Sequence, residues 1–512
     1  MRCFLLLLIF ISSSLHANDK WDLLIRNGLV IDGTGAAGQR LVIGIEGDRI
    51  VYVGPDREGF DAKDVIDAEG LVVTPGFIDP HTHAWDERGA QGGILLESYL
   101  TQGITTVFSG NDGKGPSDVG AALGELAQRG LGANMALFVG HGTVRRQVLG
   151  MDAREPTPQE LAEMKKLVIT SMKAGALGVS SGLFYAPGSF AKTEEVVELA
   201  RVAAGFGGVY ETHIRDESNY SIGLQAAIEE AIEVGRIAGV PVHIAHIKAL
   251  GVDVWGQSNE VIARIDAARA EGIRVTADQY PWRASGTRIS NALVPRWAMA
   301  GGRIQMLARL KAPESKGRIH EQMWENLRRR GGAEAILLTG GKFEWRGQTL
   351  AHFAEVRGES AIAAADYILH EGDAGIASFN MHEDDIQAFM AQPWVMTSSD
   401  GGAGHPRKYA SFPNKFRRYV DELSLLPLED FVHKSTLLTA RTFGLVNRGV
   451  ISEGAFADVL LFDPQVFGPI ATYAQPAKPS VGVQYLLVNG KLAIRQGQLT
   501  GHLAGNSLAR QH

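Results

Sequence analysis

The central part of the chain alternates short apolar runs with longer amphipathic stretches. The runs are rich in Val, Ile, Leu and Phe, which favours buried strands, and helical spacing of apolar residues is seen at 194–204 and 223–238. Strands that alternate with helices form parallel sheets, because a helix returns the chain to the same edge. The predicted strands are 71–83, 104–111, 135–141, 177–183, 209–214, 242–248, 275–280 and 394–400. This order predicts an α/β fold, a TIM-type (β/α)8 barrel within residues 75–445.

Both ends of the chain have a different pattern, in which short strands are separated by Gly and Asp turns. Such strands begin near Asp22, Leu41 and Ile50, and they recur at 457–463 and 483–490. Two β-rich ends that flank one long α/β segment indicate a small domain assembled from both. We therefore expect a β-sandwich made of residues 18–74 and 446–512.

A long insertion separates the seventh and eighth predicted strands. Residues 283–375 contain Trp297, Trp324, Trp345 and a basic run at 328–330. Large aromatic side chains need to be buried, so we expect a folded cap over the barrel mouth rather than a flexible linker. A further strand-like run at 377–381 has no place in a count of eight strands.

The first 17 residues have the pattern of a signal peptide. Arg2 precedes the apolar run 3–11, and Ala17 follows as a small residue before a cleavage point. A membrane span would need about 20 apolar residues. We expect residues 1–17 to be removed and the mature protein to be periplasmic or secreted, without membrane attachment. The single cysteine is Cys3, so the mature chain would have no disulfide and no cysteine nucleophile.

The overall composition is that of an ordinary globular protein. Of 512 residues 45% are hydrophobic and 21% are charged, and the formal net charge is −7. This mild acidity gives no reason to expect nucleic acid or an anionic membrane as a partner. A small-molecule substrate is the expected partner. Composition leaves the oligomeric state open.

Metal-binding residue types stand at the ends of several predicted strands. His81 and His83, one residue apart, project from the same face of the first strand. The complete set is His81, His83, Asp112, His213, His246 and Asp400. Active sites of (β/α)8 barrels form where the strands end, so these side chains can converge on one cavity. Neutral imidazoles and carboxylates suit divalent transition metals, so the pattern predicts a centre of one or two ions.

Each of these residues also has a structural interpretation when it is taken alone. A buried histidine is often a core group, Asp112 precedes Gly113 as in a turn, and Asp400 could cap a helix. Their recurrence at strand ends favours metal binding. His141, in the segment Gly-His-Gly-Thr, fits either a structural role at the rim or a substrate contact.

Taken together, the motifs resemble those of the amidohydrolase superfamily, and within it the D-aminoacylase (N-acyl-D-amino-acid deacylase) family. The resemblance runs from about Trp21 to Gly490. It is carried by PGFIDPHTH (75–83), VGHGTVR (139–145), SGLFYAPG (181–188), ETHIRDE (211–217), HIAHIKA (243–249), DQYPW (278–282), SSDGG (398–402) and GHPR (404–407).

The resemblance implies roles for individual residues. The histidines His81, His83, His213 and His246 would bind metal, and Asp400 would be the general acid and base. Arg407 would bind the α-carboxylate of the substrate through a bidentate pair. Further substrate contacts would come from Tyr185, Lys248, Tyr280 and Ser285, with His141 as a candidate.

One position departs from the family pattern. The family has Asn-Cys-Gly with a metal-binding cysteine where this chain has Asn111-Asp112-Gly113. The fourth predicted strand also has no lysine, the residue that bridges two metals in carboxylated form elsewhere in the superfamily. Asp112 would then be the bridging anion. Zinc is the expected metal, but oxygen in place of sulfur makes the site harder and therefore more tolerant of manganese or cobalt.

The implied reaction is hydrolysis of the amide bond of N-acyl-D-amino acids, or of peptides with D-residues, to a carboxylic acid and a free D-amino acid. The alternative is another amidohydrolase that acts on a cyclic amide, a lactone, an ester or a dipeptide. Arg407 argues against substrates without a carboxylate. A non-catalytic member, or a barrel that only binds ligands, would not need an intact set of metal ligands.

Overall fold

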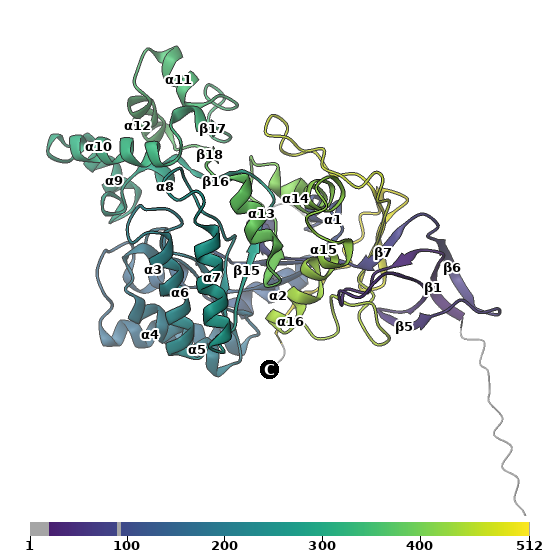
Figure 1. The fold of residues 1–512 in the computed structure, drawn as a ribbon. Coiled ribbons are helices and arrows are strands. Elements are labelled where there is room, and N and C mark those ends of the chain that lie inside the picture. Colours follow the sequence, from purple (N-terminus) through teal and green to yellow (C-terminus); the bar gives the residue numbers. More distant parts are fainter. Residues whose placement is uncertain (1–19, 90–93, 511–512) are drawn as a thin grey trace, which may run out of the picture.

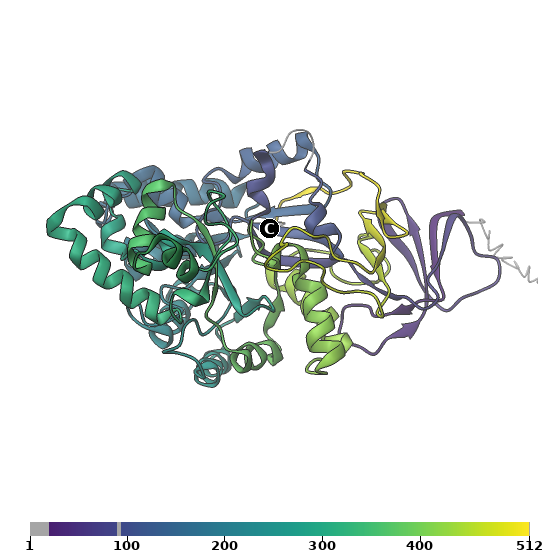
Figure 2. The same ribbon diagram turned by 90° about the horizontal axis from the view of Figure 1, so that it is seen from above.

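The computed structural model describes residues 20–89 and 94–510. The predicted signal peptide, residues 1–17, lies outside this part of the chain. Figure 1 shows a central barrel, a β-sandwich at one end and a largely helical cap above the barrel. Seen from above in Figure 2, the sandwich lies at the end of the molecule opposite the cap.

Eight parallel strand positions form the barrel. In chain order they are β8 (Phe77–Thr82), β9 (Ile104–Ser109), β10 (Asn134–Leu137) with its continuation β11 (Val139–Gly140), β12 (Gly178–Gly182), β13 (Val209–His213), β14 (Val242–Ile244), β15 (Val275–Gln279) and β19 (Val395–Thr397). The ring closes where the Asp400 N–H donates to the His81 carbonyl at 2.9 Å and Thr82 pairs with Gly401. The predicted (β/α)8 barrel is confirmed.

Helices cover the outside of the barrel. They include α2 (Val119–Arg129), α3 (His141–Leu149), α4 (Pro158–Lys173), α5 (Thr193–Gly205), α6 (Leu224–Ala238), α7 (Ser258–Ala270), α13 (Glu383–Ala391), α15 (Leu428–Ser435) and α16 (Leu437–Phe443). In α6 the buried positions include Leu224, Ile228 and Ile232, a stripe at helical spacing that faces the strands. The N-terminus of α4 is fixed by a capping box between Thr157 and Glu160.

Two predicted strands are shorter than their apolar runs. The run 71–83 is divided at Gly76 into β7 (Val72–Pro75) and β8. A Cβ on Gly76 would lie 2.2 Å from the Thr105 side chain, so only glycine allows the chain to pass from the sandwich into the barrel here. The run 242–248 leaves strand geometry after Ile244, which sets the following residues, including His246, in an irregular segment.

The β-sandwich is built from both ends of the chain. Its larger sheet has the order β23-β22-β21-β20-β7-β2-β3, and its smaller sheet has the order β5-β4-β1-β6. The N-terminal strands are β1 (Lys20–Arg26), β2 (Leu29–Val30), β3 (Gln39–Arg40), β4 (Val42–Glu46), β5 (Arg49–Gly54) and β6 (Asp61–Asp67); the C-terminal ones are β20 (Val459–Phe462), β21 (Val483–Val488), β22 (Lys491–Arg495) and β23 (Gln498–Leu499). Apolar side chains such as Ile43, Val73 and Leu461 form its core. The last strand, β24 (Ser507–Leu508), pairs with β10 of the barrel instead.

The segment between β15 and β19 has a core of its own. A three-stranded antiparallel sheet, β16 (Ala284–Arg288), β18 (Gly375–Phe379) and β17 (Ile336–Leu338), packs with α8 (Ile289–Leu293), α9 (Arg303–Lys311), α10 (Pro313–Arg329), α11 (Leu350–Arg357) and α12 (Ala361–Glu371). The surplus run 377–381 corresponds to β18, which explains why it has no place in the barrel. Trp345 is fully buried, but Trp324 is 58% exposed, so the expectation that all the cap tryptophans are buried is wrong.

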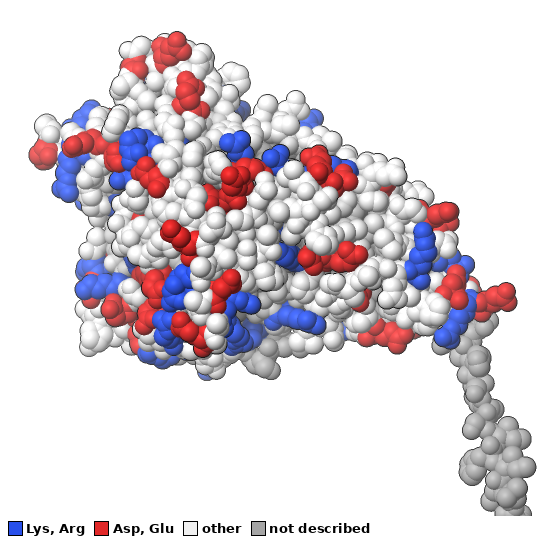
Figure 3. Space-filling view, in the orientation of Figure 1, with Lys and Arg blue, Asp and Glu red and all other residues white. Residues whose placement is uncertain are grey.

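On the face shown in Figure 3, acidic and basic side chains are intermixed rather than gathered into a patch of one sign. Among the described residues, no helix is both long and apolar enough to span a bilayer.

Candidate metal centre

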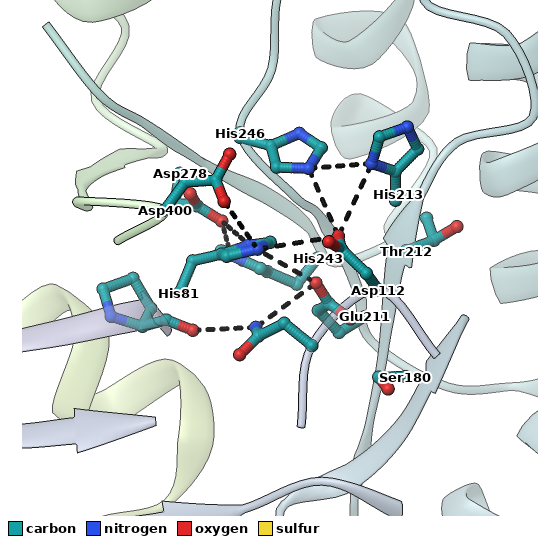
Figure 4. Close-up of polar contacts among 12 residues, drawn as sticks. His81, Asp112, Ser180, Glu211, Thr212, His213, His243, His246, Asp278 and Asp400 are labelled. Atoms are coloured by element: carbon teal, nitrogen blue, oxygen red, sulfur yellow. Dashed lines mark hydrogen bonds and ion pairs between the residues drawn. The ribbon is translucent and has the colours of Figure 1, made fainter. Parts of the chain in front are cut away.

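The six predicted metal-centre residues lie together where the barrel strands end. His81 is part of β8 and His83 follows it, Asp112 follows β9, His213 ends β13, His246 follows β14 and Asp400 follows β19. Figure 4 shows His81, His213 and His246 directed toward Asp112, with Asp400 beside His81. Parallel strands end at the same rim, which is why residues so distant in sequence meet.

Asp112 is the point at which three imidazoles meet. Its Oδ1 atom lies 3.3 Å from His246 Nε2, 3.5 Å from His213 Nδ1 and 3.6 Å from His81 Nε2. Ligands about 2.1 Å from a tetrahedral zinc ion are separated by about 3.4 Å. These separations therefore match the spacing of donors around one metal ion.

A second group of donors, formed by His83 and Asp400, shares His81 Nε2 with the first group. His83 Nε2 is 3.2 Å from Asp400 Oδ1 and 3.8 Å from Asp112 Oδ2, and His81 Nε2 is 3.7 Å from Asp400 Oδ1. The two carboxylate oxygens of Asp112 thus face different groups. This is the arrangement that a carboxylate bridging two metal positions requires.

The chemistry of the donors fits a bound metal. Both ring nitrogens of His81 are buried without a hydrogen-bond partner in the described part of the chain, and its Nε2 atom faces Asp112 and Asp400. Buried polar atoms are normally paired, and an unpaired imidazole nitrogen has a lone pair that a metal ion can use. The residues present therefore fit a centre of one or two divalent ions.

Electrostatics favour a cation at the same place. Burial alone would lower the pKa of His81, but the charges of Asp278, Asp112 and Asp400 raise this pKa to about 9. Burial raises the pKa of Asp400, yet the charge of Arg407 and the contact with His83 bring this pKa well below its usual range. A group of carboxylates that favours a proton on His81 also favours a metal cation.

The backbone at the centre is unusual. Asp112, His246 and Asp400 have φ angles of 59°, 36° and 47°. Non-glycine residues seldom adopt this left-handed region, and a histidine there is less common than an aspartate. Such conformations cost free energy, so they persist only where the surrounding structure enforces them, and they cluster at functional sites.

A cavity of about 760 Å³ opens above the metal-centre residues. Its wall includes His83, Asp112, Asp400 and Arg407 from the barrel, together with Arg288 of the cap strand β16. The guanidinium of Arg407, at the start of α14 (Arg407–Lys415), forms an ion pair with Asp400 at 2.7 Å. Its Nε atom makes no hydrogen bond to any described residue, so donors remain for a ligand.

The predicted substrate-contact residues are divided between the cavity and its surroundings. Tyr185 lines the cavity, and its ring lies 4.7 Å from that of His213. Tyr280 lies under Arg407, with the guanidinium 4.7 Å from the ring centre. Ser285 is in β16 with 7% exposure, outside the cavity wall.

His141 and Lys248 bind other protein groups. His141 Nε2 is 2.8 Å from Glu195 Oε1, and Arg145 pairs with the same carboxylate, which favours the structural interpretation of this histidine. Lys248 is directed toward Glu217, with Nζ 2.5 Å from Oε1, and does not line the cavity. The substrate roles inferred for both residues stay predictions.

Several charged residues near the centre were not predicted. Glu211 Oε1 and Asp278 Oδ2 lie 3.6 and 3.7 Å from His81 Nδ1, and Lys114 Nζ lies 3.2 Å from Asp112 Oδ2. Glu217 contacts His213 and His246. The signal available in the sequence was their position inside the motifs ETHIRDE, DQYPW and Asn-Asp-Gly-Lys.

Comparison with known proteins agrees with this geometry. The model of the family described as "Amidohydrolase family" matches residues 64–278. The chain is 34% identical to a D-aminoacylase from Alcaligenes xylosoxydans xylosoxydans, over 96% of this chain and 98% of that protein. It is also 34% identical to an N-acyl-D-glutamate deacylase from the same organism, over 96% and 97% of the two chains.

A solved structure resembles this one over its whole length. It is that of N-acyl-D-glutamate deacylase from Bordetella bronchiseptica, in complex with zinc and a phosphonate inhibitor that mimics the tetrahedral intermediate. The TM-score is 0.82 and the identity 32%, and the match covers 96% of this chain and 100% of that chain. The chain therefore belongs to the amidohydrolases, in the family that contains the D-aminoacylases.

Proposed function

We propose that this protein is a metal-dependent hydrolase that cleaves N-acyl-D-amino acids to a carboxylic acid and a free D-amino acid. The observation that carries the proposal is the presence of Arg407 and the metal-type donors in one cavity, with Arg407 2.7 Å from Asp400. A carboxylate-binding guanidinium next to a hydrolytic centre suits a substrate whose scissile amide is adjacent to an α-carboxylate. The D-configuration rests on the related deacylases.

Each polar group has a defined task in this proposal. A divalent ion held by His81, His83, Asp112, His213 and His246 would supply Lewis-acid chemistry, lowering the pKa of water and polarising the carbonyl. Asp400 is ionised near neutral pH, so its carboxylate can accept a proton from the attacking water and return it to the leaving amine. Arg407 holds the α-carboxylate and so orients the amide.

We propose zinc as the metal, with manganese or cobalt as the alternatives that the oxygen donor Asp112 admits. The related deacylase structure was obtained with zinc, and three histidine–carboxylate groups in this chain have donors within 4.8 Å of one another. Elemental analysis of protein purified without added metal tests this choice. We also propose export to the periplasm or the medium, based on residues 1–17 alone.

The cavity has room for substrates larger than an N-acetyl amino acid. Its volume of about 760 Å³ falls in the range of about 300–1,000 Å³ that suits drug-sized ligands. Its wall includes the polar side chains of Lys114, Arg288, Asn291 and Lys408. A peptide that ends in a D-residue would place amides against this wall, so such peptides are a second candidate substrate class.

The experiment is a direct assay of amine release by the zinc-loaded mature protein. Matched N-acetyl-D- and N-acetyl-L-amino acids test stereochemistry, and glycyl-D-amino acids compared with N-decanoyl-D-amino acids test the acyl side. Turnover confined to the D series is expected. No turnover of any of them by protein with metal analytically present would contradict the proposal and favour a cyclic amide, a lactone or an ester.

A further inference from the structure

Glu217 is a buried carboxylate outside the cavity that contacts two of the metal-centre histidines. It lies in the segment after β13, and its side chain is 7% exposed. Its Oε1 atom is 3.1 Å from His246 Nδ1, and its Oε2 atom is 3.7 Å from His213 Nε2. These are the ring nitrogens opposite those that face Asp112. Both imidazoles therefore lie between the same two carboxylates.

The contact with His246 has the geometry that orients metal-binding histidines, and the same carboxylate faces His213 at a longer distance. A histidine that binds a metal through one nitrogen usually donates its other N–H to a carboxylate, which fixes the tautomer and the ring plane. We propose that Glu217 is a positioning residue that orients both His213 and His246 toward Asp112. The inference rests on the proposed metal centre, and it assigns one carboxylate to two ligands.

Lys248 holds Glu217 in place. Its Nζ atom is 2.5 Å from Glu217 Oε1 and 2.7 Å from His246 Nδ1, and its side chain is 4% exposed. When His246 binds a metal through Nε2, its Nδ1 carries the proton, so Nδ1 needs an acceptor and not a second donor. Glu217 is that acceptor, and Lys248 neutralises the carboxylate. Lys248 then acts on the metal centre through Glu217.

Direct coordination by Glu217 is the competing arrangement. An ion among Glu217, His213 Nε2 and His246 Nδ1 would have the Lys248 ammonium as a close neighbour of like charge. Glu217 is not part of the cavity wall, so that ion would be separated from Asp400 and Arg407. Both facts favour the positioning role.

The test measures metal affinity without substrate, by competition of Zn2+ with a chromophoric chelator. Glu217→Gln keeps the shape but removes the negative charge and one of the two acceptor oxygens that face the imidazoles, so Zn2+ affinity should fall about 10–100-fold, with the wild-type number of ions at saturation. The visible spectrum of Co2+-loaded protein should change in parallel. Glu230→Gln is the matched control, because Glu230 is a part-buried glutamate paired with Arg215; it should keep wild-type affinity.

Two results would overturn the proposal: wild-type Zn2+ affinity in Glu217→Gln, or the complete loss of one ion at saturation, which would make Glu217 a ligand. Lys248→Met provides a second variant if Glu217→Gln does not fold. It should lower Zn2+ affinity in the wild-type background and add nothing in the Glu217→Gln background. A Lys248→Met protein with unchanged Zn2+ affinity and a raised KM would contradict the positioning role of Lys248.

These outcomes are independent of the proposed substrate. A wild-type protein that binds Zn2+ but turns over no N-acyl-D-amino acid contradicts the proposed function and leaves the Glu217 comparison valid.

Discussion

Asp400→Asn is the substitution that most directly tests the proton-transfer role. Asp400 Oδ1 is 3.2 Å from His83 Nε2, and Oδ2 is 2.7 Å from an Arg407 nitrogen. Asparagine has the same shape and keeps one oxygen, so the cavity should survive, but the amide cannot take up a proton at neutral pH. General acid–base catalysis contributes about 10²–10⁴-fold, which corresponds to about 2.7–5.4 kcal/mol in the barrier.

We therefore expect kcat to fall by about two to four orders of magnitude, with KM little changed because Arg407 remains. The assay is steady-state amine release, with zinc content and the thermal midpoint measured on the same sample. Asp385→Asn is the matched control, since Asp385 is a buried aspartate that accepts from the Gly256 and Ser258 N–H groups. A kcat within tenfold of wild type at equal zinc content would refute the role of Asp400. A loss of activity explained fully by missing zinc would make Asp400 mainly a ligand.

Other substitutions test other parts of the structure. Arg407→Lys should raise KM about tenfold or more in steady-state assays, because a single ammonium cannot form a bidentate pair; an unchanged KM would exclude carboxylate binding at this residue. Asp112→Cys should shift metal preference from Mn2+ toward Zn2+ in competition binding, since thiolate is the softer donor, and equal preference would contradict the bridging role. Burial raises the pKa of Glu195, but the contacts with His141 and Arg145 outweigh burial and lower this pKa overall. The ionised Glu195 therefore stabilises the fold fully above the unfolded pKa of about 4.3, and this stabilisation is lost as the pH falls through the folded pKa. Thermal midpoints of Glu195→Gln should therefore lie below wild type near neutral pH and approach it in acid; a constant difference would show that the charge is irrelevant. Phe77→Ala removes a fully buried ring stacked 5.4 Å from Phe412 and should cost about 3–5 kcal/mol in urea unfolding, whereas a loss below about 1 kcal/mol would contradict this packing.

The order of barrel strands and the rim position of the histidines could be predicted from the sequence. Local periodicity distinguishes strands from helices, and parallel strands place their ends at one rim, so His81 and Asp400 could be placed together without coordinates. The backbone at the centre could not be predicted. His246 has a left-handed φ because β14 ends at Ile244, whereas the apolar run 242–248 predicts a strand that continues through His246.

Contacts set by loops and by chain ends were also beyond the sequence pattern. Lys248 faces Glu217 because the segment after β13 folds back beside β14, and no local periodicity records that path. The pairing of Ser507 with Met135 joins residues from different predicted domains. Trp324 shows that aromatic content alone does not fix burial, since its helix α10 exposes this side to solvent.

The closure of the barrel between its first and last strands has a consequence for folding. His83 and Asp400 are 317 residues apart in the chain, and the whole cap folds between β15 and β19. Bringing such distant residues together carries a large loop-closure entropy, so the ring is expected to close late. A metal ion held by His83 would sit where His83 Nε2 lies 3.2 Å from Asp400 Oδ1, and it would act as a clasp on that ring, binding the closed form and not the open one. By mass action, a chelator would then loosen the seam between β8 and β19 before other parts of the barrel. The rate of hydrogen exchange at the Asp400 amide, which donates to the His81 carbonyl, would measure this effect with and without bound metal.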